Sequence, residues 1–241
     1  MTNPTAAIII IGNEILSGRT LDINTQEIAL RLGENGINLI ETSTIPDDRQ
    51  MIIDVVRKFS AKYDYVFTTG GIGPTHDDIT AEAVAAAFNL PYTRNQEIYE
   101  ILKEYYAEMG EALNSAREKM AYIPESSELV YNDATRVPGF VTNNVFSMAG
   151  IPNIMKSMLQ SVLPDLKKGV VVKSQSIEVM IGESKIAVQF EELQKKYPNV
   201  DMGSYPFTKD GVNGTVLVLR SIDYEDIEKS FQELKKLCAN P

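Results

Sequence analysis

DYVFTTGGIGPTHDDIT, residues 64–80, carries the clearest fold signal in this 241-residue chain. Its first part, residues 64–69, is apolar, aromatic and β-branched, which predicts a short strand that runs directly into a glycine-rich turn. An alanine-rich helix is predicted to follow over about residues 79–88, with Asp77 or Asp78 as its N-terminal cap. A strand, a turn and a helix in this order are typical of the repeating unit of a parallel sheet.

The segments on either side repeat this pattern. Residues 6–11 are a run of alanine and isoleucine that stops at Gly12, which is typical of a strand buried on both faces of a parallel sheet. A helix is predicted to begin at Asn24, with Glu27 as its capping-box partner. The other predicted elements before residue 165 are a strand at 37–45, a helix opening at 46–48, two helices within 95–120, strands at 128–131 and 145–148, and a helix at 152–163. The alternation predicts an α/β fold in which helices cover both faces of a mostly parallel sheet.

The pattern changes near residues 163–169, which contain Pro164 and Gly169. The elements predicted after this point are a strand at 174–181, a helix at 184–196, strands at 200–205 and 214–219, and a helix at 223–237. The sequence therefore predicts two domains, a large one over residues 1–168 and a small α+β domain over residues 169–241.

The composition is that of an ordinary globular protein, with 44% apolar and 23% charged residues. A net charge of −10 disfavours binding to a nucleic-acid backbone. The sequence contains no apolar run long enough to span a membrane and no signal-peptide pattern at its start. The single Cys238 can form neither an internal disulfide nor a cysteine metal site. Together these features predict a cytoplasmic protein.

The glycine-rich turn is the first candidate for chemistry. Gly70, Gly71 and Gly73 follow a strand and precede a helix, an arrangement that lets backbone amides approach a phosphate closely. The pattern fits neither the P-loop nor the dinucleotide fingerprint. Asp77 and Asp78 beside such a phosphate site favour a divalent metal or acid–base chemistry, although either aspartate could equally serve as a helix cap.

A second polar loop, residues 12–18, follows the first strand and is predicted to lie at the same edge of the sheet. Glu14 could then face Asp78 across one pocket and supply a second carboxylate for a metal. Alternatively, Glu14 is a solvated loop residue and Asn24 is a plain helix cap. His76, the only histidine, is predicted to be an exposed loop residue rather than a general base.

These loops carry two motifs of a known family, and the chain resembles the N-terminal domain of the CinA proteins. Residues 9–18, with Asp22 and Asn24, are similar to the family's first motif, and residues 69–80 are similar to its second. The resemblance covers roughly residues 6–165 and implies the three-layer αβα fold of the molybdopterin-binding MoaB/Mog proteins. The rest of the chain is similar to the KH-like middle domain of CinA.

The resemblance implies two kinds of activity. The CinA branch is associated with hydrolysis of ADP-ribose to AMP and ribose 5-phosphate, with a divalent metal (Mg²⁺, Mn²⁺ or Co²⁺) and help from K⁺, and a related domain hydrolyses FAD. The MoaB/Mog branch binds molybdopterin and adenylylates its phosphate with Mg²⁺. The expected function is therefore a metal-dependent nucleotide pyrophosphatase; the alternatives are a molybdopterin-binding or molybdopterin-adenylylating protein and a non-catalytic member.

By the same resemblance, Asp78 is expected to be the leading catalytic residue and a metal ligand with Glu14, while Asp77 positions Asp78 or the metal. The residues expected to bind substrate or phosphate are Gly12, Asn13, Glu14, Asn24, Thr69, Gly70, Gly71, Gly73, Pro74, Thr75 and Thr80. The expected partners are a nucleotide or molybdopterin and a second copy of the chain, with a dimer favoured.

The chain departs from the family at its third motif, because Ala149 replaces a proline and Ile154 replaces an acidic residue. The sequence also stops at Pro241, so the amidase activity of the CinA C-terminal domain is not expected here.

Overall fold

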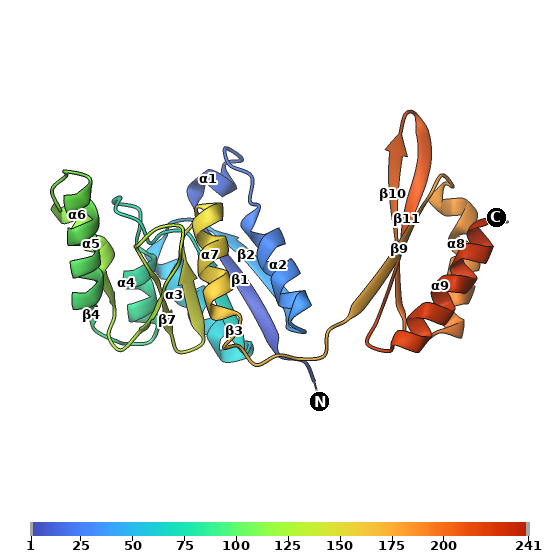
Figure 1. Cartoon of the computed structure of the whole chain (residues 1–241), viewed down its shortest axis with the longest axis horizontal. Helices are drawn as coiled ribbons and strands as arrows, with labels where there is room; N and C mark the ends of the chain where they lie inside the picture. Colours follow the sequence, from blue (N-terminus) through green and yellow to red (C-terminus); the bar gives the residue numbers. More distant parts are fainter. Residues whose placement is uncertain (1, 240–241) are drawn as a thin grey trace. The chain divides into compact units, whose positions relative to one another are not determined.

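The computed structural model describes residues 2–239, which divide into two compact units, one ending at Gly169 and the other beginning at Val170 (Figure 1). Each unit has its own sheet and its own buried apolar core. Within residues 2–239, no helix is both long enough and apolar enough to cross a membrane.

The first unit is built on a six-stranded sheet with the order β2-β1-β3-β8-β7-β6. Its strands are β1 (Thr5–Ile11), β2 (Asn38–Ile45), β3 (Tyr65–Thr69), β6 (Glu128–Val130), β7 (Gly139–Thr142) and β8 (Val145–Met148). The strands β2, β1, β3 and β8 are parallel, whereas β7 and β6 continue the sheet in antiparallel pairs. The carboxyl ends of the four parallel strands therefore meet at one edge of the sheet.

Helices cover both faces of this sheet, which confirms the predicted α/β fold (Figure 1). On one face, Ala6, Ile8 and Ile10 of β1 share a core with α2 (Asn24–Glu34) and α7 (Pro152–Val162). On the other face, Ala7, Ile9 and Ile11 share a core with α3 (Arg49–Lys62) and α4 (Thr80–Ala87). None of these β1 residues is more than 4% exposed, as expected for a central strand whose side chains alternate between two apolar layers.

The predicted capping box at Asn24 is wrong. Asn24 is the first residue of α2, and the carboxylate of Asp22 accepts hydrogen bonds from the backbone amides of Asn24 (3.0 Å) and Thr25 (3.2 Å). Glu27 instead accepts a hydrogen bond from Arg31, one helical turn later, at 2.9 Å. Asp22 satisfies two of the free amides of the first turn, so the Asn24 side chain is available for another contact.

The predicted cap of α4 by Asp77 or Asp78 is also wrong. The residue before the helix is Ile79, and no side chain caps it. Both carboxylates turn back to Thr75 within their own loop. The aspartates are therefore part of the glycine-rich turn rather than of the helix.

Between α4 and β6 the chain forms several short elements. These are β4 (Tyr92–Arg94), α5 (Gln96–Glu108), α6 (Ser115–Glu118), a 3₁₀ turn η1 (Lys119–Ala121) and β5 (Tyr122–Pro124). The two helices predicted within residues 95–120 are present as α5 and α6, but the second has only four residues. The antiparallel pair β4–β5 and the strand β7 are present in the structure but were not predicted from the sequence.

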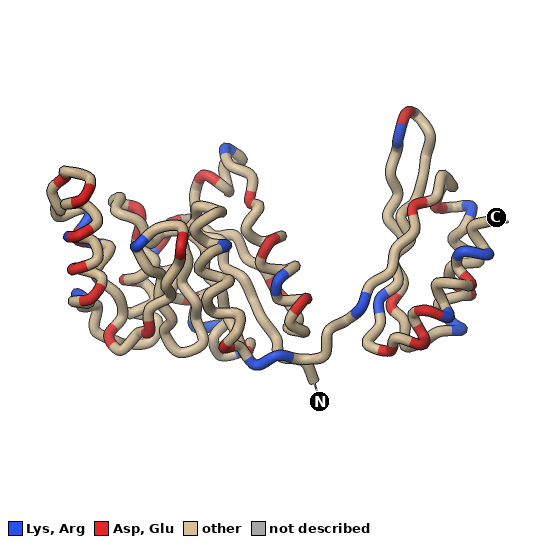
Figure 2. The backbone as a smooth tube through the Cα atoms, in the orientation of Figure 1, with Lys and Arg blue, Asp and Glu red and all other residues tan. Residues whose placement is uncertain are grey.

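The second unit follows the predicted order of strand, helix, two strands and helix. Its elements are β9 (Lys173–Val179), α8 (Glu183–Lys196), β10 (Asp201–Lys209), β11 (Val212–Ser221) and α9 (Tyr224–Ala239). The three strands form an antiparallel sheet with β11 in the middle, and Leu217 and Leu219 of β11 share a core with both helices. Figure 2 shows acidic and basic positions interspersed along α8 and α9, where several of them form ion pairs.

Candidate functional site

A cavity of about 570 Å³ lies in the first unit, where loops follow the carboxyl ends of the parallel strands. Loops after all four parallel strands contribute to it: the segment after β1, which includes α1 (Asn13–Leu16), Asp47 after β2, the glycine-rich turn after β3, and residues 149–152 after β8. Its lining residues are Ile11, Glu14, Thr20, Asp47, Gly70, Gly71, Ile72, Gly73, Pro74, Thr75, Asp77, Asp78, Tyr105, Tyr106, Met120, Thr135, Val137, Pro138, Ala149, Gly150, Ile151, Pro152, Ile154 and Met158. This is the edge at which open parallel sheets bind ligands.

The glycine-rich turn is packed too tightly for side chains at two positions. Gly70 and Gly71 have φ angles of 99° and 70°, which residues other than glycine rarely adopt. A Cβ atom on Gly70 would lie 2.2 Å from the carbonyl oxygen of Ile11, and one on Gly71 would lie 2.1 Å from the hydroxyl oxygen of Thr80. The two glycines therefore allow the turn to lie directly against the end of β1 and the start of α4.

The same turn presents unused hydrogen-bond donors. Its carbonyl groups are engaged, since Thr80 donates its hydroxyl to the oxygen of Gly70 (3.0 Å) and its amide to the oxygen of Gly71 (2.9 Å). Within residues 2–239, the backbone amides of Gly71, Ile72 and Gly73 have no acceptor. All three residues line the cavity. Consecutive free amides of this kind form a binding site for an anion such as phosphate.

Thr75 organises the two aspartates that follow it. The Asp78 carboxylate accepts hydrogen bonds from the Thr75 amide (2.7 Å) and the Thr75 hydroxyl (2.5 Å). The Asp77 carboxylate also contacts this hydroxyl, and the contact lowers the pKa of Asp77, so the group remains ionised. Both carboxylates are thus held in the loop as they line the cavity.

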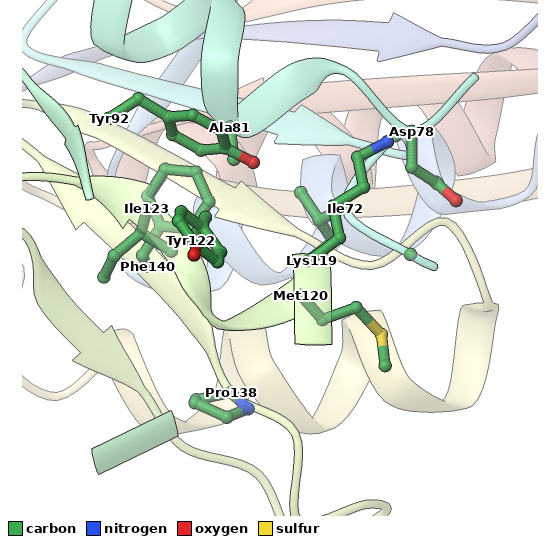
Figure 3. A pocket seen from close by; sticks show the side chains of 12 residues that line it. Ile72, Asp78, Ala81, Tyr92, Lys119, Met120, Tyr122, Ile123, Pro138 and Phe140 are labelled. Carbon is green, nitrogen blue, oxygen red and sulfur yellow. The ribbon is translucent and has the colours of Figure 1, made fainter. Parts of the chain in front are cut away.

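The charge of the cavity is strongly negative. Four carboxylates line it, those of Glu14, Asp47, Asp77 and Asp78, and the described lining includes no lysine or arginine. The basic side chain of Lys119 donates to the carbonyl oxygen of Thr75 at 2.8 Å and lines an adjoining small pocket with Asp78 (Figure 3). A phosphate in the cavity would therefore need a cation to offset these carboxylates.

The donor set fits a Mg²⁺-type ion that is shared with a ligand. Among residues 2–239, no three His, Cys, Asp or Glu side chains are grouped to hold a metal by themselves. Mg²⁺ is usually bound through one or two carboxylates together with water and the phosphates of its substrate, so a complete protein cage is not required. Glu14 and Asp78 line one cavity and could supply those carboxylates.

Most of the expected site residues are brought together. The cavity is lined by Glu14, Gly70, Gly71, Gly73, Pro74, Thr75, Asp77 and Asp78. A smaller adjoining cavity of about 60 Å³ is lined by Thr69 and Asn24, and by Glu14, which belongs to both. The side chain of His76 is 96% exposed, as expected for a loop residue without a catalytic role.

Three expected residues lie outside both linings. Gly12 donates its amide to the carbonyl oxygen of Ile45 (3.1 Å), and the Asn13 amide donates to the carboxylate of Asp47 (2.9 Å). Thr80 is fully buried and braces the glycine-rich turn. A direct ligand contact for these residues stays a prediction, whereas their structural contacts hold the loops in place.

Asn24 joins two of the loops. Its side-chain amide donates to the carbonyl oxygen of Gly150 at 2.8 Å. Gly150 in turn packs against Gly70, because a Cβ atom added to Gly150 would lie only 3.3 Å from the Gly70 Cα atom. Asn24 is 7% exposed, and within the described residues its carbonyl oxygen Oδ1 has no hydrogen-bond partner. The hydrogen bond therefore connects the loop after β1 with the loop after β8.

We expect the variant Asn24→Asp to be less stable than Asn24→Ala. Alanine removes one hydrogen bond, which lowers the free energy of unfolding by about 1 kcal/mol. Aspartate replaces the donor by a buried carboxylate that faces the Gly150 oxygen, and we expect a loss of roughly 3 kcal/mol. Urea denaturation of both variants measures the difference. Equal losses would show that a carboxylate facing the Gly150 oxygen costs no more than the lost hydrogen bond, and an unchanged stability of Asn24→Ala would show that the contact contributes nothing.

Several lining residues were missed from the sequence. Asp47 lies two residues after the strand that ends at Ile45, so its place at the carboxyl edge could be inferred, but the sequence pattern assigns it only to a helix start. Tyr105, Tyr106 and Met120 come from the region around α5 and η1, and they carry no motif that marks them as site residues. Only the packing of this region against the glycine-rich turn brings them to the cavity.

Comparisons with known proteins agree with this geometry. The model of a family described as a probable molybdopterin binding domain matches residues 7–168, and the model of the FAD synthase middle domain matches residues 171–240. A protein of Archaeoglobus fulgidus is 36% identical over 95% of this chain and 96% of its own length. Protein PH0439 of Pyrococcus horikoshii is 36% identical over 80% of each chain.

A solved structure supports the same assignment. The protein CinA of Thermoplasma acidophilum, described as having unknown function, is 30% identical and superimposes with a TM-score of 0.63 over 68% of this chain and 99% of its own. The resemblance to CinA that the two loop motifs indicate is thereby confirmed. The match to the family model covers both the glycine-rich turn and the loop after β1. This chain therefore belongs to the family described as a probable molybdopterin binding domain.

Proposed function

We propose that the first unit binds molybdopterin, a phosphorylated pterin, in the cavity at the carboxyl edge of the sheet. The observation that carries this proposal is the row of free backbone amides at Gly71, Ile72 and Gly73, which line the cavity beside Asp78. The family description supports a pterin as the ligand. The amides would donate to the phosphate oxygens, and Thr75 would hold the adjoining carboxylates in place.

Glu14 and Asp78 would bind the cation that such a ligand requires. Four carboxylates repel a phosphate, and a divalent cation such as Mg²⁺ supplies the compensating charge when it is bound. The roles of the chain's own groups are then distinct: the glycine-rich turn orients the phosphate, while the carboxylates orient the cation against it. This arrangement would also suit adenylyl transfer to the phosphate, because both reactants carry phosphate groups.

Hydrolysis of ADP-ribose, or of a related dinucleotide such as FAD, is the second candidate function. Two observations favour it: the carboxylates of Asp77 and Asp78 line the cavity, where they would orient a metal and a water against a pyrophosphate, and residues 171–240 match the FAD synthase middle domain. Cleavage of the pyrophosphate would release AMP and a second phosphorylated product. A divalent metal, with K⁺ as a further ion, belongs to this candidate as well.

One set of assays on the full chain separates these functions. Binding of molybdopterin is measured by titration with Mg²⁺ and again with excess EDTA, and we expect binding that depends on Mg²⁺. In parallel, ADP-ribose, FAD, or ATP with molybdopterin is incubated with Mg²⁺, Mn²⁺ or Co²⁺ and K⁺, and the products are separated by chromatography. Release of AMP from ADP-ribose or FAD would favour the second candidate. Absence of both binding and turnover would refute the proposal.

A further inference from the structure

The cavity has an aromatic wall in addition to its acidic loops. Tyr105 and Tyr106, adjacent residues of α5, both line it, together with the apolar side chains of Met120, Val137 and Pro138. Adjacent residues of a helix point about 100° apart, yet both tyrosines contribute to the lining. The buried residues Ile98 and Leu102 attach the same helix to the core. The wall is therefore a fixed part of the first unit.

The two rings are held in position before any ligand binds. The guanidinium of Arg117 lies 4.1 Å from the centre of the Tyr106 ring, and Arg117 is itself fixed by donation to the carbonyl oxygen of Ala112 at 2.8 Å. The ring of Tyr105 meets that of Tyr106 edge to face, with centres 5.3 Å apart and planes at 74°. Such an arrangement loses little conformational freedom when a planar group docks against it.

We propose that Tyr105 and Tyr106 bind the planar ring of the ligand and make the site selective for a phosphorylated heterocycle over a simple sugar phosphate. This inference rests on the proposed function, since it adds a ring subsite to the phosphate subsite of the glycine-rich turn. Aromatic side chains bind heterocycles by stacking, and the energies observed for bases correspond to about a tenfold to hundredfold change in affinity per ring. A sugar phosphate has no planar heterocycle and therefore gains no stacking energy from the two tyrosines.

The test compares ligands that differ in the ring. Dissociation constants are measured by calorimetry for molybdopterin, AMP and ribose 5-phosphate, each with Mg²⁺, on the full chain and on Tyr106→Leu and Tyr105→Ala. We expect each variant to bind the preferred ring ligand about tenfold more weakly, with ribose 5-phosphate changed less than about twofold. Leucine keeps an apolar contact with the core at residue 106, and circular dichroism checks that each variant is folded. Tyr106→Phe is expected to retain wild-type affinity, because it preserves the ring.

The control is Tyr131→Ala, which removes a half-exposed tyrosine that donates to Glu97 of α5 and does not line the cavity. It should leave all three affinities unchanged. Unaltered binding of the ring ligands by Tyr106→Leu and Tyr105→Ala, or equal weakening of ring ligands and ribose 5-phosphate, would overturn the ring subsite while the proposed function stands. If the wild-type protein binds none of the three ligands, the proposed function itself fails.

Discussion

Replacing Asp78 by asparagine is expected to weaken Mg²⁺-dependent binding of a phosphorylated ligand by about a hundredfold. The substitution preserves the size of the side chain, and its remaining oxygen can still accept from the Thr75 amide. It removes the negative charge of the Asp78 carboxylate, which we propose binds the cation. Calorimetric titration of the variant with molybdopterin or AMP, with and without Mg²⁺, measures the effect. The Asp78→Asn variant should also lose any turnover of ADP-ribose.

The control for this variant is Asp54→Asn, which neutralises an exposed carboxylate on α3 that lies outside the cavity. It changes the net charge by the same amount and should leave affinity within about twofold. Asp77→Asn tests the division of roles and should have a smaller effect than Asp78→Asn, because Asp77 is expected only to position the other groups. Equal affinities for wild type and Asp78→Asn would remove this residue from the site.

Replacing Gly70 by alanine is expected to lower the free energy of unfolding by about 3 kcal/mol and to abolish phosphate binding. A left-handed backbone conformation costs an alanine roughly 1–2 kcal/mol, and the added methyl group overpacks the turn by a similar amount. The clash is with the Ile11 carbonyl oxygen, at 2.2 Å, which belongs to the backbone of the central strand and cannot rotate away. The turn must therefore move, and its free amides move with it.

Gly18→Ala is the matched control. Gly18 has a φ of 72°, but a Cβ atom there meets nothing within 4 Å. This variant therefore carries the conformational cost alone, about 1 kcal/mol, and should retain ligand binding. Urea denaturation and titration with molybdopterin are made on both variants. If Gly70→Ala and Gly18→Ala have similar stability and affinity, the close approach of Gly70 to β1 contributes to neither property.

The central part of the fold could be predicted from the sequence because its signals are local. Residues 6–11 and 64–69 are strands in the structure as predicted, with boundaries that differ by one residue. An apolar β-branched run that ends at glycine has few alternatives to a buried strand. The glycine-rich turn and the carboxylates of Glu14, Asp77 and Asp78 were recognised for the same reason, since their residue types and spacing form motifs that short segments display by themselves.

The caps of α2 and α4 could not be predicted, because several residues compete for each role. Asp22, rather than Asn24, serves the first amides of α2, and Asp78 binds Thr75 rather than α4. Each choice depends on which partner the folded chain brings within hydrogen-bond distance. Strand β7 is recognisable only through its antiparallel pairing with β8, which is a tertiary contact of weakly patterned residues.

The order of the elements, the central strands and the chemistry of the loops that follow them can be predicted from the sequence, because these features depend on residues close together in the chain. The residues that complete the cavity depend on contacts between distant segments. The hydrogen bond from Asn24 to Gly150 joins residues 126 positions apart, and Tyr105 and Tyr106 reach the acidic loops from a helix that carries no motif. Contacts between distant segments follow from how the helices pack on the sheet, and side-chain packing of this kind leaves no local pattern in the sequence.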